Sequence, residues 1–171
     1  MKHVTTKFNE DVFKNAWSKA IVIEQTKRLE KYAQKELSQM AGNHEFRNRT
    51  YNLQDSLCWI LFYNGEKRSY GFYGGGRASE ASVLHAWGNA AYQKEINGRE
   101  LAQSFVDSYT PTVQNGWEVV WASVAPYGSY LEQGKTPMGI IFRVITQEYD
   151  NIKKTLKTPC VVTVEINPVI S

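Results

Sequence analysis

The residues best suited to metal or thiol chemistry are three histidines and two cysteines. A zinc site needs several ligands at helical or hairpin spacing, and His3, His44 and His85 each lack such a partner. His85 could act as a lone base, but a packed or interface histidine is the better interpretation. Cys58 and Cys160 lie inside apolar, strand-like runs, where a thiol behaves as a small hydrophobic group. The sequence therefore predicts neither a metal site nor a disulfide framework.

Phosphate binding and nucleophilic catalysis are also poorly supported. The glycine run 74–76 is followed by Arg77, without the Gly-Lys-Ser/Thr and helix start of a P-loop. Ser129 has no glycine two residues later, so it does not form a nucleophile elbow. Nothing in the sequence brings together any two of the carboxylates, which are predicted to be solvated, and Glu100 already has a helix-capping role. We expect no catalysis and no cofactor. The carboxylates considered are Glu100, Asp107, Glu118 and Glu132.

Composition indicates one globular domain over residues 1–171, with 42% hydrophobic and 13% aromatic residues. Twenty lysines and arginines face 17 acidic residues, and the excess is local, because residues 1–50 hold ten basic and six acidic side chains. On a long helix such an excess is typical of a solvated face. No run approaches the ~18 apolar residues of a membrane span, and the start lacks the apolar stretch of a secretory signal. We therefore expect no membrane partner and a chain that folds in the cytoplasm.

The elements that position these residues begin with one long helix over residues 9–41. At ~1.5 Å per residue it would span close to 50 Å, which is long for so small a domain. Part of it is therefore predicted to pack outside its own subunit. Apolar residues recur along it at three- and four-residue steps: Phe13, Trp17, Ala20, Ile21, Leu29, Tyr32, Ala33, Leu37 and Met40.

The rest of the chain reads as short strands and helices. A helical turn at 52–57 leads into a hairpin around Asn64-Gly65, with 66–68 predicted to lengthen its loop. Residues 74–96 form an irregular insertion, and Asn97 with Glu100 resembles a capping box for a helix at 99–109. The remaining predictions are strands at 117–124 and 160–166, a short turn at 127–134 and a helix at 140–157. The fold class is α+β: a long N-terminal helix packed on a small, mostly antiparallel sheet, with two further helices.

The aromatic residues need a further explanation, since the chain has 10 Tyr, 7 Phe and 5 Trp. Trp59 and Phe62 fit a core. Trp17, Trp87 and Tyr92 lie in segments that need not be core, and Trp and Tyr are common anchors of protein interfaces. The insertion is accordingly predicted to be an assembly element. The residues themselves therefore indicate a self-associating α+β domain.

Two motifs extend this interpretation to a family. Residues 49–57, RTYNLQDSL, resemble the "RTGNLRxSI" element of the tail-completion or head–tail joining (neck, minor head) proteins of tailed bacteriophages. Residues 125–134, APYGSYLEQG, are similar to the family's "YAxYLExGT" element. Tyr51 stands where the family has glycine, and Gly128 where it has alanine. The strand at 160–166 is an addition to the family pattern, and the segment 74–110 is an enlarged insertion.

The resemblance implies a structural virion protein that forms a homo-oligomeric ring of six or twelve copies at the head–tail junction. Its partners would be portal or connector and tail proteins, and packaged DNA would pass through the lumen without sequence-specific binding. Glu132 would lie at a rim, facing a neighbour's Arg or Lys. The full set of candidate interface residues is Phe13, Trp17, Arg49, His85, Trp87, Tyr92 and Glu132.

An alternative hypothesis is a nucleic-acid-binding accessory protein. It would use the basic N-terminal helix together with aromatic side chains on exposed strands. The aromatic strands here are neutral or flanked by acidic residues, and the basic residues lie among acidic ones on the helix. These features favour the ring hypothesis but leave the alternative open.

Overall fold

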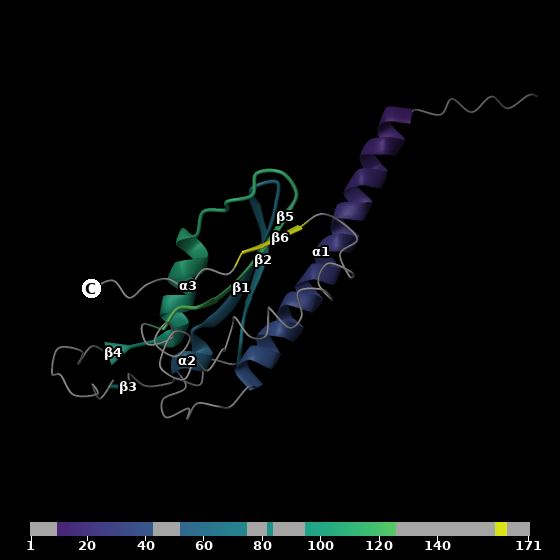
Figure 1. The fold of residues 1–171 in the computed structure, drawn as a ribbon. Coiled ribbons are helices and arrows are strands. Elements are labelled where there is room, and N and C mark those ends of the chain that lie inside the picture. Colours follow the sequence, from purple (N-terminus) through teal and green to yellow (C-terminus); the bar gives the residue numbers. More distant parts are fainter. Residues whose placement is uncertain (1–9, 43–51, 75–81, 84–94, 126–159, 164–171) are drawn as a thin grey trace, which may run out of the picture.

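The computed structural model describes residues 10–42, 52–74, 82–83, 95–125 and 160–163. It confirms the α+β class, with a long N-terminal helix lying against a small sheet (Figure 1). The turn predicted at 127–134, the helix predicted at 140–157 and residues 164–166 lie outside the described residues. The elements are α1 Glu10–Gly42, α2 Asn52–Asp55, β1 Leu57–Tyr63, β2 Glu66–Phe72, β3 Ser82–Val83, β4 Glu95–Ile96, α3 Gly98–Ser108, β5 Trp117–Ser123 and β6 Cys160–Thr163.

The main sheet has the strand order β2-β1-β5-β6. β1 pairs antiparallel with both β2 and β5, as expected for a mostly antiparallel sheet. β6 instead runs parallel to β5, so this edge is the parallel part of the mostly antiparallel sheet that the sequence predicts. A parallel neighbour requires a long connection, and the 36 residues 124–159 between the two strands provide one.

The hairpin between β1 and β2 has a tighter turn than the sequence predicted. Residues 66–68 belong to β2, and Tyr63 pairs directly with Glu66 across a two-residue turn. Asn64 and Gly65 both have positive φ angles, 51° and 77°, which is the conformation of a turn that matches the twist of the strands. The charged residues misled the prediction because β2 is an edge strand, where charged side chains are common.

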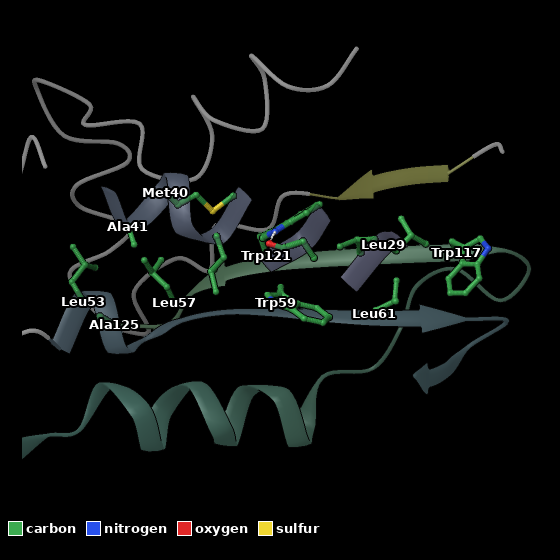
Figure 2. Close-up of a cluster of buried hydrophobic side chains, with 13 residues drawn as sticks. Leu29, Met40, Ala41, Leu53, Leu57, Trp59, Leu61, Trp117, Trp121 and Ala125 are labelled. Atoms are coloured by element: carbon green, nitrogen blue, oxygen red, sulfur yellow. Dashed lines mark hydrogen bonds between the residues drawn. The ribbon is translucent and has the colours of Figure 1, made fainter. Parts of the chain in front are cut away.

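Both faces of the sheet are covered, which gives the domain two hydrophobic layers. Alternate side chains of β1 and β5 point to α1 on one face and to α3 on the other. Figure 2 shows the α1 side, where the side chains of β1 and β5 meet those of the helix. That layer comprises Leu29, Ala33, Leu37, Met40, Ala41, Leu53, Leu57, Trp59, Leu61, Trp117, Val119, Trp121 and Ala125.

Two tryptophans of the sheet attach α1 by hydrogen bonds as well as by packing. The indole Nε1 of Trp59 donates to Gln34 Oε1 at 2.8 Å, and that of Trp121 donates to the carbonyl of Ala33 at 3.1 Å. Both contacts lie in the C-terminal half of α1. The sheet therefore holds the helix at this half.

The start of α3 forms as predicted. Asn97 Oδ1 accepts from the backbone N–H groups of Arg99 and Glu100, and Asn97 Nδ2 donates to Glu100 Oε1 at 3.0 Å. The Arg99 side chain then donates to the carbonyls of Tyr73 and Gly74, which fastens the end of β2 to α3.

Within the predicted irregular insertion, β3 and β4 form a short antiparallel ladder.

Candidate functional site

The N-terminal half of α1 extends beyond the sheet, as Figure 1 shows for the purple part of the helix. The described side chains from residue 11 to residue 28 include no buried one, whereas six of those from Leu29 to Ala41 are buried. Four of the five large hydrophobic side chains that are exposed among the described residues lie in this half of the helix: Val12, Trp17, Ile21 and Ile23. Trp17 is 61% exposed. The projecting half therefore presents apolar surface to its surroundings.

Trp17 and Ile21 lie on a different side of α1 from the residues that pack on the sheet. Trp17 and Ile21 precede Leu29 and Ala33 by twelve residues each, which at 3.6 residues per turn leaves an offset of about 120°. Their spacing predicts one apolar series, but the structure divides the four residues into a buried stripe and an exposed one. A shallow groove follows the exposed stripe. We call the residues that line it the outer face of α1: Trp17, Ala20, Ile21, Glu24, Gln25 and Arg28.

The outer face becomes basic toward the middle of the helix. The Arg28 Nε lies 2.9 Å from Glu24 Oε1, in an exposed pair one helical turn apart. Lys27 precedes Arg28 directly, and Lys31 and Lys35 follow it at steps of three and four residues; all three lysines are exposed. Lys35 Nζ also lies 3.6 Å from Oε1 of the buried Glu36. We call Lys27, Arg28, Lys31 and Lys35 the basic row of α1.

Of the predicted interface residues, the structure places the side chain of Trp17 alone. Phe13 lies in α1, but its side chain lies outside the described part. The five others also lie outside the described residues: Arg49, His85, Trp87, Tyr92 and Glu132. Sequence spacing places Ile21 with the buried residues in one apolar series and gives Ile23 no role. The exposed basic row agrees with the solvated basic face that the sequence predicts for this helix. A helical projection that separates two apolar stripes finds Ile21. Ile23 lies in line with the buried Ala41, five turns further along the helix, and it is exposed because this half of α1 extends beyond the sheet.

One of the four candidate carboxylates is buried, contrary to the prediction that they are solvated. Glu118 of β5 is 0% exposed. Its Oε1 accepts from the hydroxyls of Tyr109 and Thr112, and its Oε2 accepts from the backbone N–H groups of Thr112 and Val113, at 2.9 to 3.0 Å. Four donors occupy the carboxylate, so it ties the segment between α3 and β5 to the sheet. This is the geometry of a structural anchor.

Cys58 behaves as the sequence predicted. It is fully buried in β1 on the side of the sheet that faces α3. Burial raises the pKa of its thiol from 9.0 to about 12, although Arg99 acts in the opposite direction. The thiolate is the reactive form, so this thiol has little nucleophilic character near neutral pH.

We therefore predict that Cys58 resists alkylation until the chain unfolds. In a Cys160→Ser background at pH 8, iodoacetamide should modify the folded protein at least about a hundredfold more slowly than the urea-unfolded protein. Intact mass spectrometry over time measures both rates. Equal rates in the two states would contradict the burial of this thiol.

Among the residues that the structure describes, no group of three or more His, Cys, Asp or Glu side chains is arranged to hold a metal ion. Within the same residues, no helix combines the length and apolarity that crossing a bilayer requires. The described surface does present the outer face of α1, with Trp17 61% exposed, and the exposed basic row.

Comparison with known proteins adds no relative: no family model, no curated protein and no solved structure matches this chain.

Proposed function

We propose that this chain is a non-enzymatic structural subunit that assembles into a ring in the neck of a tailed bacteriophage, between portal and tail. The observation that carries the proposal is the projecting half of α1, where Trp17 and Ile21 are exposed on the outer face. Exposed aromatic and aliphatic side chains on one helix stripe are typical of surfaces that another protein covers.

The two sequence motifs supply the particular assembly. In the first motif, Asn52 to Leu57 form α2 and the start of β1, and all six residues are buried. Ser56 Oγ donates to the carbonyl of Leu53 at 2.8 Å, so this part of the motif acts in folding. Of the second motif, Ala125 lies within the described residues. The placement in a virion neck therefore rests on the resemblance of residues 49–57 and 125–134 to the neck family.

The alternative, a nucleic-acid-binding accessory protein, draws on the basic row of α1. It also needs aromatic side chains available for stacking on bases. In β1 and β5 the tryptophans and Phe62 are buried, so they are unavailable to stack without unfolding. The structural role accounts for the exposed Trp17 and for the buried tryptophans of β1 and β5, whereas Tyr70 of the edge strand β2 is exposed and is the aromatic strand residue that the alternative could use.

Native mass spectrometry tests the proposal directly. The purified full chain, alone and co-expressed with a portal protein, should give one closed oligomer of defined copy number, and the family resemblance implies six or twelve copies. A chain that stays monomeric at micromolar concentration in both preparations would remove the proposal. Sequence-independent DNA binding by such a monomer would favour the alternative instead.

Trp17→Asp should prevent ring formation while leaving a folded monomer. The indole is mostly exposed in the single subunit, so its loss costs the fold little, whereas a carboxylate inside an apolar contact is strongly unfavourable. Native mass spectrometry should show loss of the oligomer, and circular dichroism should show an unchanged thermal unfolding midpoint. Asn15→Asp is the matched control, because it adds the same charge two residues away, on nearly the opposite side of the helix. If Trp17→Asp unfolds the chain, Trp17 is a core residue and this interface is wrong.

A further inference from the structure

The exposed face of α3 has the opposite charge to the basic row of α1. The α3 side chains that point away from the sheet are Glu100, Gln103, Ser104, Asp107 and Ser108, and they border a shallow depression. Glu100 and Asp107 are both exposed, and they are the charged residues of this set. We call these five residues the acidic face of α3.

The two charged faces lie on opposite sides of the same sheet. α1 packs on the layer that contains Trp59 and Trp121, and α3 packs on the layer that contains Ile60 and Phe62. Figure 1 shows the two helices on either side of the strands. One subunit therefore cannot bring its own basic row into contact with its own acidic face, but two copies can.

The spacing of the charges also matches. Seven residues separate Glu100 from Asp107, and seven separate Arg28 from Lys35. Seven residues make nearly two helical turns, so each pair lies on one side of its helix, about 10 Å apart. Two helices laid side by side can thus bring both carboxylates opposite cations at once. Lys31, between Arg28 and Lys35, would face the uncharged Gln103 and Ser104.

We propose that copies of this chain associate head to tail, with the basic row of α1 in one subunit against the acidic face of α3 in the next. The inference rests on the proposed ring and specifies its subunit contact. A contact between two different surfaces is heterologous, and repetition of it closes a ring when the rotation per subunit permits. An isologous α1–α1 contact would instead pair the chains as dimers and place the basic rows near each other.

Charge reversal on each face separately tests this contact. The α1-reversed variant is Arg28→Glu/Lys35→Glu, which reverses the two cations that the spacing places opposite Glu100 and Asp107. The α3-reversed variant is Glu100→Lys/Asp107→Lys, which keeps Asn97 as the acceptor for the backbone N–H groups of Arg99 and Glu100. Each variant alone should associate at least about tenfold more weakly than the wild type, because like charges then face each other. Lys19→Glu, two residues beyond Trp17 and on nearly the opposite side of α1, is the control and should assemble normally.

Combining the reversals identifies the geometry. A chain that carries all four substitutions exchanges the signs at the four paired positions, so it should assemble again, as should an equimolar mixture of the two variants. Sedimentation velocity measures each case, and circular dichroism establishes that every variant is folded. If the wild type forms rings but the separate reversals assemble normally, or the four-substitution chain fails, the head-to-tail contact is wrong while the ring stands. If the wild type forms no oligomer, the proposed function and this contact fall together.

Discussion

Gly98→Ala should destabilise the domain by about 3 kcal/mol, because the first residue of α3 packs directly on the backbone of α2. A Cβ at residue 98 would lie 2.1 Å from the carbonyl oxygen of Asn52 and 2.9 Å from its carbonyl carbon. That oxygen already accepts from the Ser56 N–H at 2.9 Å, so it cannot move without loosening α2. The Gly98 N–H also donates to Asn52 Oδ1 at 3.1 Å. Relief of the clash therefore requires α3 to move away from α2.

Urea unfolding followed by circular dichroism measures the loss. Gly42→Ala is the matched control, since an added Cβ there meets nothing within 4 Å. That substitution should change the free energy of unfolding by less than about 1 kcal/mol, with a gain expected from the helix propensity of alanine. If Gly98→Ala unfolds within about 1 kcal/mol of the wild type, then α3 is not held against α2 as closely as the structure places it.

Local signals explain why so much of the fold could be predicted. The long helix follows from apolar spacing without Gly or Pro, and its ends agree with α1 to within one residue. Asn97 and Glu100 are three residues apart, so the cap of α3 is readable from four consecutive positions. The Asn64-Gly65 pair likewise marks its own turn, because few other residues accept two successive positive φ angles.

Features that depend on distant residues were harder to predict. The parallel register of β6 on β5 depends on a connection of 36 residues, and nothing in either strand encodes its direction. The division of α1 into a buried and a projecting half depends on where the sheet ends. Among the candidate interface residues, Trp17 was predicted to lie outside the core, and its side chain is exposed in the structure; its part in an interface stays a prediction.

Glu118 is the clearest case of a residue whose role the sequence conceals. It occupies the run WEVVWAS, where alternation predicts that one face of the strand meets solvent. β5 is instead covered on both faces, so its single carboxylate must find donors inside the protein. The donors come from residues five to nine positions earlier in the chain, in the segment that leaves α3.

Glu118→Ala should therefore cost about 3 kcal/mol of the free energy of unfolding, measured by urea titration. The substitution leaves two backbone N–H groups and two hydroxyls without their acceptor, and each unsatisfied buried donor is unfavourable by about 1–3 kcal/mol, less where water can reach it. Glu118→Gln should lose about half as much, because the amide keeps one acceptor oxygen. Glu66→Ala serves as the control, since its pair with Arg68 is exposed and should contribute less than about 1 kcal/mol. A Glu118→Ala protein as stable as this control would show that the carboxylate does not anchor the segment between α3 and β5, and would reopen a chemical role for Glu118.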